Sequence, residues 1–328
     1  MRKIRFAVVG TNFISDNFVD AVISSGVAEI SAVFSRKLDT GRLFAEKHGL
    51  PKIYIDYAEM LADADIDAIY VASPTICHYE HTLAALRAGK HVLCEKMICT
   101  STSQLIELRD EARERGLVLL EAMRPDFDPA YDAIRENLAK IGKIRRATLE
   151  FCQYSSRYDR FLSGEVLNAF DPTMKNSALA DIGIYPLHMA HALFGEPLGV
   201  HSSAIFLRNG FEGAGNITLE YDGALVSIIY SKISDSVNSS VIEGERGSIL
   251  IDKISAPTRI TLCPRRESPK VIWEDSLPNN MVFEVRAFAS MVDGASSPCP
   301  YLDISEMTLR TVEESYRQTG ADEKMKAE

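Results

Sequence analysis

A turn that could hold a phosphate begins at Gly10, directly after the apolar segment 4–9 and before an amphipathic one. At such a turn, backbone N–H groups and the positive end of a helix dipole can meet the pyrophosphate of a dinucleotide. Of the three glycines in a GxGxxG pattern only Gly10 is present, with Asn12 in the second place and Ser15 in the third. Asn tolerates positive φ and Ser is small, so the turn can still form, although an ordinary strand-turn-helix connection is an equal alternative. The candidate phosphate-binding residues are Gly10, Thr11, Asn12, Phe13 and Ile14.

The next apolar segment ends in Ser35-Arg36-Lys37, at the place where NAD-binding proteins carry an acidic residue for the ribose 2′-hydroxyl. An acidic side chain would repel a 2′-phosphate, whereas Ser and Arg can hydrogen-bond it and Arg can also stack on adenine. The sequence therefore favours NADP over NAD. The alternative is that Arg36 and Lys37 belong to an ordinary solvated loop.

Short apolar runs alternate with amphipathic segments through the first third of the chain. Strands buried on both faces form continuous apolar runs, and their alternation with helices implies right-handed crossovers and a parallel sheet. We predict an α/β fold that starts with a doubly wound, Rossmann-type domain over residues 1–121. Its expected strands are 4–9, 30–35, 68–72, 91–94 and 117–121, and its expected helices are 14–24, 40–48, 78–88 and 103–115.

After residue 121 the pattern changes to period-two alternation, which is typical of a mainly antiparallel, open sheet. We expect an α+β domain for substrate binding and oligomerisation over residues 122–328, with strands at 147–154, 217–221, 225–231, 240–243 and 248–252. Helices are expected at 130–138, 182–193, 281–292 and about 304–319, where the last could pack back on the first domain. Residues 320–328 have the composition of a polar tail.

The composition limits the possible partners. The chain has 328 residues, a formal charge of −10 and scattered basic residues, which argues against nucleic-acid or membrane-surface binding. Neither a signal peptide nor an apolar run of the roughly 20 residues that span a membrane is present, so we expect a soluble, cytoplasmic protein. The six cysteines form no CxxC pair and are expected to be reduced and buried. His188 and His191 have helical spacing with no cysteine nearby, so we predict packed or hydrogen-bonded histidines and no metal.

Four motifs occur in an order that identifies a family resemblance. They are Gly10-Thr11-Asn12-Phe13-Ile14, Ala72-Ser73-Pro74-Thr75 with His78, Gly89-Lys90-His91-Val92-Leu93-Cys94-Glu95-Lys96, and Asp181-Ile182-Gly183-Ile184-Tyr185. Each motif alone is weak, but their order and spacing resemble the glucose-fructose oxidoreductase, inositol dehydrogenase and rhizopine-catabolism (Gfo/Idh/MocA) family over nearly the whole chain. The resemblance implies an NAD(P)-dependent oxidoreductase.

The resemblance also implies an active site. Lys96, beside Glu95, would bind and orient a substrate hydroxyl near the nicotinamide and help its proton to leave. Asp181 and Tyr185 would form the family's D-x-x-x-H/Y motif, with Tyr185 as proton donor or acceptor, although Asp181 could instead cap a helix. Ser73, Pro74, Thr75, His78, Glu95 and Lys96 would contact the cofactor, and Arg157, Lys175 and Asn176 are candidate ligands of sugar hydroxyls.

The chain departs from the family pattern at several positions. Met97 stands where the family has Pro, which could displace Lys96. Asp126 and Asp128 replace an Arg and a His that are usual in the family, and Asn176-Ser177 replaces Gly-Gly. The substrate therefore does not transfer from the family.

The expected reaction is reversible oxidation of a secondary alcohol on a sugar, cyclitol or related polyol, or reduction of the matching carbonyl, with NADP or NAD. Two alternatives stay open: a dinucleotide-sensing regulatory protein on the same fold, and a reductase of the dihydrodiol or biliverdin type. Because the open face of an antiparallel sheet is commonly buried against a copy, we expect a homodimer or homotetramer.

Overall fold

The computed structural model describes residues 2–275, 277 and 279–325. The chain forms two compact units, Met1–Phe127 with Pro278–Asp303, and Asp128–Leu277 with Ile304–Glu328. This division differs from the predicted one, because residues 122–127 and the segment 278–303 belong to the first unit.

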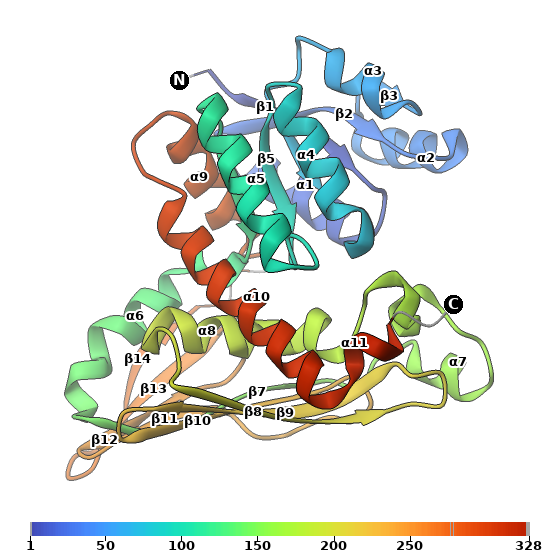
Figure 1. Ribbon diagram of the computed structural model, residues 1–328. Helices are drawn as coiled ribbons and strands as arrows, with labels where there is room; N and C mark the ends of the chain where they lie inside the picture. Colours follow the sequence, from blue (N-terminus) through green and yellow to red (C-terminus); the bar gives the residue numbers. More distant parts are fainter. Residues whose placement is uncertain (1, 276, 278, 326–328) are drawn as a thin grey trace. The chain divides into compact units, whose positions relative to one another are not determined.

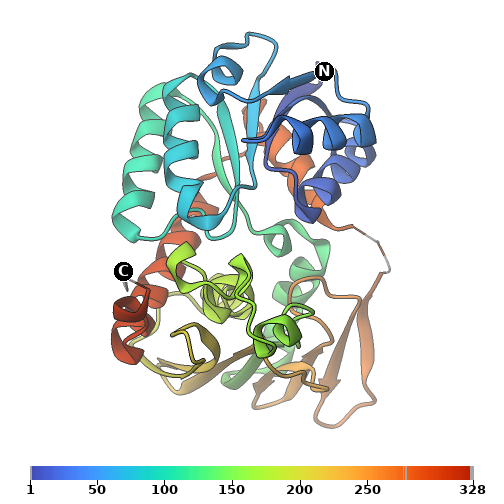
Figure 2. The same ribbon diagram turned by 90° about the vertical axis from the view of Figure 1, so that its right-hand side faces the viewer.

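The first unit is built on a six-stranded parallel sheet, as predicted. The strand order β3-β2-β1-β4-β5-β6 reverses direction at β1, which defines a doubly wound sheet. In Figure 2 the cyan-to-green α4 and α5 lie on one side of this sheet and the blue α1 and α2 on the other. The strands are β1 (Ile4–Val9), β2 (Ala28–Phe34), β3 (Lys52–Tyr54), β4 (Ala68–Val71), β5 (His91–Glu95) and β6 (Leu119–Ala122), and the helices are α1 (Phe13–Ser25), α2 (Leu38–His48), α3 (Tyr57–Ala62), α4 (His78–Arg87), α5 (Thr102–Arg115) and α9 (Met281–Val292).

Aromatic side chains fill the core of this unit. Phe18 of α1 stacks on Tyr70 of β4, and Phe288 of α9 lies against Phe6 of β1 with ring centroids 5.3 Å apart. Helix α9 packs along α1, so a segment distant in sequence completes the cover on that face. The sequence pattern gave no signal for β3 and α3, because both are short and only partly buried.

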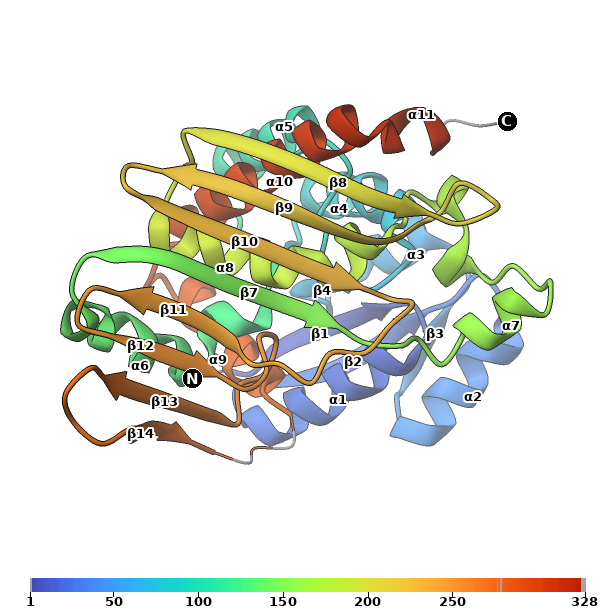
Figure 3. The ribbon, with the colours of Figure 1, turned by 90° about the horizontal axis from the view of Figure 1, so that it is seen from below.

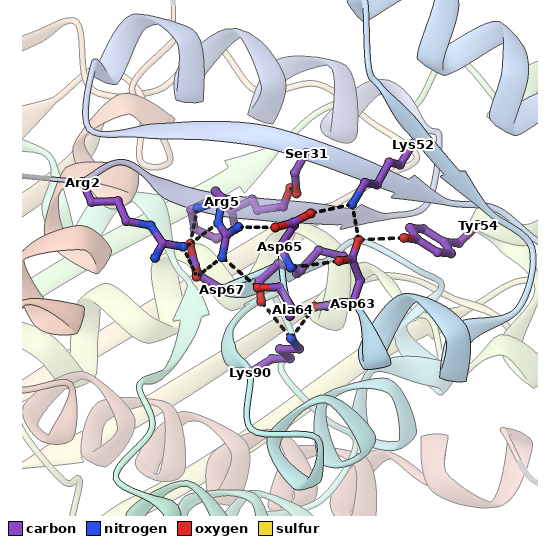
Figure 4. Close-up of polar contacts among 12 residues, drawn as sticks. Arg2, Arg5, Ser31, Lys52, Tyr54, Asp63, Ala64, Asp65, Asp67 and Lys90 are labelled. Carbon is purple, nitrogen blue, oxygen red and sulfur yellow. Dashed lines mark hydrogen bonds and ion pairs between the residues drawn. The ribbon is translucent and has the colours of Figure 1, made fainter.

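Charged residues form a network of ion pairs and hydrogen bonds at the edge of the sheet where the parallel strands begin (Figure 4). Arg5 of β1 binds both carboxylate oxygens of Asp67, which precedes β4. Lys52 of β3 and the hydroxyl of Tyr54 each lie 2.7 Å from Asp63 Oδ2. Since ligands bind at the opposite, carboxyl ends of such strands, we assign this network to stability rather than to chemistry.

The second unit contains an eight-stranded sheet with the order β14-β13-β12-β11-β7-β10-β9-β8 (Figure 3). It is antiparallel except for the pair β7 and β10, so the predicted mainly antiparallel sheet is confirmed. Its strands are β7 (Ile144–Cys152), β8 (Gly199–Phe206), β9 (Glu212–Tyr221), β10 (Ala224–Ser231), β11 (Ser240–Gly244), β12 (Gly247–Ile251), β13 (Arg259–Pro264) and β14 (Lys270–Glu274).

Helix α8 covers one face of this sheet by packing on β7 and β10. A π-helical turn, Leu179–Gly183, leads directly into it. The other helices are α6 (Pro129–Asn137), α7 (Tyr158–Leu162), α8 (Ile184–Phe194), α10 (Cys299–Thr319) and α11 (Ala321–Lys324), all labelled in Figure 1. The expected polar tail was wrong for residues 320–325, because α11 forms there and buries Ala321 and Met325; residues 326–328 lie outside the described part.

Candidate cofactor and substrate sites

The turn after β1 has the backbone of a phosphate-binding loop. Gly10 has φ of +108°, which L side chains rarely adopt, and a Cβ placed there would lie 2.7 Å from the carbonyl oxygen of Ala72. Glycine is therefore required at this position. Thr11, Asn12 and Phe13 follow at the surface, and the Phe13 side chain is 65% exposed.

Asn12, in the place of the second glycine, has φ of −90°, so the turn does not use the positive φ that asparagine tolerates. Its side-chain oxygen accepts hydrogen bonds from Ile14 N and Ser15 N, and its amide nitrogen lies 2.9 Å from the carbonyl oxygen of Ala72. It therefore caps α1 and ties the turn to the end of β4. The buried Ser15 in the third place allows α1 to lie close to the sheet.

The end of β2 carries Ser35, Arg36 and Lys37 as predicted, but the serine is turned inward. Ser35 Oγ lies 2.6 Å from Thr40 Oγ1 and 3.0 Å from the carbonyl oxygen of Lys37, so it shapes the loop. Arg36 and Lys37 are exposed. Burial lowers the pKa of His81 to about 4, with smaller contributions from His78 and from the positive charge of Arg36. A guanidinium beside a neutral ring and an exposed lysine suit a 2′-phosphate.

His78 joins two loops at the carboxyl edge of the sheet. Its Nε2 lies 2.7 Å from the carbonyl oxygen of Ser73, and its Nδ1 lies 2.6 Å from that of Met97. Ser73 also contacts His81, through Oγ and Nδ1 at 2.9 Å. Burial lowers the pKa of His78, while its two carbonyl contacts oppose that shift. His78 therefore connects the Ser73-Pro74-Thr75 loop to the turn that follows Lys96.

Lys96 follows the last residue of β5, at the carboxyl edge of the sheet. The Lys96–Met97 peptide bond is cis, and Met97 is buried. The buried carboxylate of Glu121 accepts a hydrogen bond from Ile98 N at 2.9 Å and so holds the far side of this turn. Glu95 is buried too and accepts a 2.5 Å hydrogen bond from the Tyr70 hydroxyl, which places it in the core beneath Lys96.

In the second unit, Asp181 lies within the π-helical turn that precedes α8. Its carboxylate pairs with Lys232 Nζ at 2.8 Å, and the residue that caps the turn is Ala178. The side chain of Asp181 is 37% exposed and that of Lys232 is 5% exposed. Asp181 is thus a partly exposed carboxylate that is paired with a buried lysine. It is not the helix cap that the sequence left open as an alternative.

Tyr185 lies one turn further, in the first turn of α8, and is 8% exposed. Its ring packs on Phe151 of β7 with centroids 5.8 Å apart. Gly183, between the two candidates, allows the turn to approach β10, since a Cβ there would lie 2.7 Å from Tyr230 Cγ. The structure therefore places Asp181 and Tyr185 on consecutive turns of one continuous helical segment.

A buried network fixes the start of this element. Glu212 accepts hydrogen bonds from the Tyr230 hydroxyl at 2.6 Å and from Leu179 N at 3.3 Å. Ser177 Oγ lies 2.8 Å from the Tyr316 hydroxyl and accepts from Ala180 N. Burial raises the pKa of Glu212, in line with a carboxyl that serves structure.

The three candidate sugar ligands have different surroundings. Arg157 is exposed at the start of α7. Lys175 adopts φ of +55° and its ammonium reaches the carbonyl oxygen of Met325 at 3.2 Å. Asn176 makes a long contact of 3.5 Å with the carbonyl oxygen of Asn168.

Three residues near these candidates were missed from the sequence: Thr40, His81 and Lys232. Thr40 and His81 belong to helices that we predicted, but a hydroxyl or imidazole on a helix gives no signal of what it faces. Lys232 comes directly after a predicted strand, where a charged residue is expected to be solvated. Its burial depends on aromatic residues that are distant in sequence.

Histidines and cysteines are the side chains to consider for metal binding and thiol chemistry. Among the described residues no group of three or more His, Cys, Asp or Glu side chains is arranged to hold a metal. His188 and His191 instead face Thr308 and Thr311 of α10. All six cysteines are free, but only Cys94 and Cys99 are buried, so the expectation of buried thiols was wrong for the other four. No helix in the described part of the chain is long and apolar enough to cross a membrane.

The doubly wound sheet and its glycine turn are features of a dinucleotide-binding, Rossmann-type fold. Comparison with known proteins agrees: residues 4–123 match the model of the oxidoreductase family with an NAD-binding Rossmann fold, and residues 131–250 match the GFO/IDH/MocA C-terminal domain. The chain belongs to the Gfo/Idh/MocA family of oxidoreductases.

Relatives that match over nearly the full length carry related activities in their names. The scyllo-inositol 2-dehydrogenase (NADP(+)) IolU of Bacillus subtilis is 38% identical, with 97% of both chains covered. The trans-1,2-dihydrobenzene-1,2-diol dehydrogenase of Oryctolagus cuniculus is 30% identical, with 92% of this chain and 94% of the relative covered. Among solved structures, the 3-ketoreductase KijD10 of Actinomadura kijaniata in complex with NADP and TDP-benzene has a TM-score of 0.87 at 25% identity, covering 97% of this chain and 98% of its own.

Proposed function

We propose that this protein is an NADP-dependent dehydrogenase that oxidises a secondary alcohol of a cyclitol, sugar or related polyol, or reduces the matching carbonyl. The observation that carries the proposal is the carboxyl edge of the first unit's sheet, where a phosphate-type turn at Gly10, the exposed Arg36 and Lys96 follow β1, β2 and β5. The NADP(+) in the name of IolU and the NADP in the KijD10 complex support the cofactor.

The residues of the chain divide into two roles. Thr11 to Ile14 would hold the pyrophosphate, Arg36 and Lys37 the 2′-phosphate, and the loop from Ser73 to Thr75, shaped by His78, the ribose and nicotinamide side. When bound, the nicotinamide supplies the carbon that takes hydride from the substrate carbon. Lys96 would orient the substrate oxygen and Tyr185 would accept its proton, so that the alcohol loses one hydride and one proton and becomes a carbonyl.

Asp181 would accept hydrogen bonds from a substrate hydroxyl, and Arg157, Lys175 and Asn176 would contact further hydroxyls. Solved KijD10 complexes include variants at one lysine and one tyrosine, the same residue types as Lys96 and Tyr185. The match to IolU makes scyllo-inositol the first substrate to test.

A second candidate activity is the oxidation of a dihydrodiol on an apolar ring. Several trans-1,2-dihydrobenzene-1,2-diol dehydrogenases are 28–30% identical to this chain. This candidate differs from the first in substrate only, since both require hydride transfer from a secondary alcohol.

The test is an assay of reduced nicotinamide formation by the purified protein with NADP or NAD, using scyllo-inositol, other inositols, aldoses and a trans-dihydrodiol. We expect turnover of a polyol with NADP and a loss of about 10²- to 10⁴-fold in kcat/KM for Lys96→Met and Tyr185→Phe. Tyr79→Phe, which removes a hydroxyl bound to Glu107 on the outer surface of α4, is the matched control and should leave turnover unchanged.

The same assay separates the alternatives. Turnover of the dihydrodiol alone would replace the polyol by the second candidate. Tight NADP binding without turnover of any alcohol or carbonyl would refute the enzyme and support a dinucleotide-sensing regulator.

The proposal includes a cytoplasmic homodimer or homotetramer. Six free thiols suit a reducing compartment. Exposed apolar side chains on the face of the second sheet opposite α8, namely Ile205, Leu225, Leu250 and Val271, suit burial against a copy. Light scattering on the wild type and on Leu225→Glu tests this point, with a fall in mass expected for the variant.

A further inference from the structure

A buried lysine in the second unit holds the carboxylate of Asp181, and the family resemblance gave no role to it. Lys232 Nζ lies 2.8 Å from Asp181 Oδ2 and 2.8 Å from the carbonyl oxygen of Ala169. The same ammonium lies 5.0 Å and 5.3 Å from the ring centroids of Phe170 and Phe211. Each of these contacts suits a cation: one charged acceptor, one carbonyl and two aromatic faces.

The backbone of Lys232 is fixed on both sides. Its N–H donates to the carbonyl of Gly213 and its own carbonyl accepts from Ser155 N, each at 2.9 Å. The lysine stem then passes beside a cluster of Phe161, Phe170 and Phe211, all buried. The ammonium therefore has little freedom to follow Asp181 if the carboxylate moves.

The two residues of the Lys232–Asp181 ion pair differ in how far they are buried. Lys232 is almost fully buried, whereas Asp181 keeps more than a third of its side chain exposed. Moving an ammonium out of water is costly, and replacing a buried ion pair by apolar residues is often neutral or stabilising. Stability alone therefore does not call for a lysine within a phenylalanine cluster. What the lysine does provide is a fixed positive charge beneath a carboxylate that faces outward.

We propose that Lys232 is a positioning residue of the substrate site, which holds Asp181 ionised and in one orientation so that the exposed part of its carboxylate accepts a hydrogen bond from a substrate hydroxyl. This inference rests on the proposed function, because it assigns Asp181 to the substrate. It makes Asp181 an acceptor throughout the reaction and leaves proton transfer to Tyr185.

The other titratable and charged groups around the turn come from four elements. They are Glu212 of β9, Tyr230 of β10, Tyr185 of α8 and Tyr316 of α10, together with Arg208, whose guanidinium lies 4.0 Å from the Phe161 ring. Burial raises the pKa of Glu212, Tyr230 and Tyr316. Lys232 forms an ion pair with Asp181 at 2.8 Å.

The experiment compares Lys232→Met, Lys232→Arg and Asp181→Asn with the wild type in steady-state kinetics across pH, with NADP and the polyol that is turned over. For Lys232→Met we expect KM for the polyol to rise at least tenfold, a smaller change in kcat, and unchanged NADPH binding. The acidic limb of kcat/KM should move to higher pH, because the carboxylate has lost the charge that disfavours its protonation. Lys232→Arg should raise KM for the polyol less than Lys232→Met does. The double variant with Lys232→Met and Asp181→Asn should have nearly the same KM as Asp181→Asn alone.

Lys90→Met is the matched control. Lys90 is also buried, and its ammonium donates to the carbonyls of Asp63 and Ile66 at 2.7 and 2.8 Å, at the edge of the first sheet away from the candidate site. It should lower Tm without moving KM or the pH profile.

The outcomes are separable. If the wild type turns over a polyol but Lys232→Met behaves like Lys90→Met, the positioning role is overturned and the proposed function stands. If the wild type binds NADPH and turns over nothing, the proposed function falls, and the role of Lys232 falls with it.

Discussion

The imidazole Nδ1 of His78 lies 2.6 Å from the carbonyl oxygen of Met97, the residue that follows Lys96. Its other nitrogen contacts Ser73, so one fully buried ring spans the loops after β4 and β5. A neutral imidazole has one N–H and can donate to only one of these carbonyls at a time. His78 is in this way coupled to the positions of both the cofactor loop and the lysine.

His78→Leu should therefore affect both stability and activity. The variant removes the ring that contacts both carbonyls and leaves the carbonyl that accepts its one N–H without that donor, which costs about 1–3 kcal/mol of unfolding free energy. Because the Lys96 turn also loses its support, we expect kcat to fall by at least tenfold. Urea unfolding and steady-state kinetics measure the two effects.

The control is His91→Leu, which removes a 2.9 Å hydrogen bond from Val118 N at the opposite end of β5. It should lose stability and keep kcat. A normal kcat in His78→Leu would show that the Lys96 turn does not depend on His78.

Gly10→Ala tests the phosphate turn. The added Cβ meets the Ala72 carbonyl at 2.7 Å and φ of +108° is strained for any L side chain, so we expect about 2 kcal/mol or more of destabilisation and at least tenfold weaker NADPH binding. Gly26→Ala also places an alanine at positive φ, but with nothing within 4 Å, and should cost only about 1 kcal/mol with normal binding. Equal effects in the two variants would contradict a close approach at Gly10.

Glu284 gives a pH dependence of stability. Its side chain is fully buried, neither carboxyl oxygen has a hydrogen-bond partner among the described residues, and burial raises its pKa well above the ordinary 4.5, with a further rise from Glu95. The folded state then retains a proton that the unfolded chain releases. Stability from this group is full below pH 4.5 and falls by about 1.4 kcal/mol for each pH unit above it, until the raised pKa is reached.

Glu284→Gln should remove this slope and raise Tm at pH 7 relative to the wild type. Thermal unfolding between pH 5 and pH 8 measures the effect, with the exposed Glu29→Gln as control. A wild type whose stability does not fall over this range would contradict a protonated Glu284.

Asp63 gives a pH dependence of stability opposite in sign to that of Glu284. Hydrogen bonds from Lys52, from Asp65 N and from the Tyr54 hydroxyl hold its pKa well below the usual 3.8. A carboxylate with a lowered pKa contributes stability that is present above pH 3.8 and is lost as the pH falls toward the folded-state value. Asp63→Asn should therefore lower Tm most near pH 7, and the difference from the wild type should shrink below pH 3.8. Asp20→Asn, at an exposed position of α1, should change Tm little at either pH.

The sequence predicted those parts of the fold that local patterns encode. Continuous apolar runs predicted β1, β4 and β5, and the N-terminal turn predicted the start of α1, each to within one residue at either end. Strand β3 was missed because its three residues are only partly buried, and α9 could not be assigned to the first unit because its contacts with α1 join positions far apart in sequence.

The candidate site was predicted less completely. The order of the family motifs predicted Lys96, Asp181 and Tyr185 as site residues, and the residue types after β2 predicted Arg36 as a cofactor-binding residue. The direction of the Ser35 hydroxyl depends on Thr40, and the burial of Lys232 depends on Phe170 and Phe211, so neither could be read from local sequence. Side-chain partners of this kind are set by tertiary packing.

The central claim is an NADP-dependent enzyme, and its most direct test is equilibrium binding of NADPH and NADH by nicotinamide fluorescence to the wild type and to Arg36→Ala. We predict that the wild type binds NADPH more tightly than NADH, and that Arg36→Ala weakens NADPH binding by about tenfold or more while NADH binding is nearly unchanged, since a charge-assisted contact to phosphate contributes about 1.5–3 kcal/mol. Failure of the wild type to bind either dinucleotide would contradict an NADP-dependent enzyme.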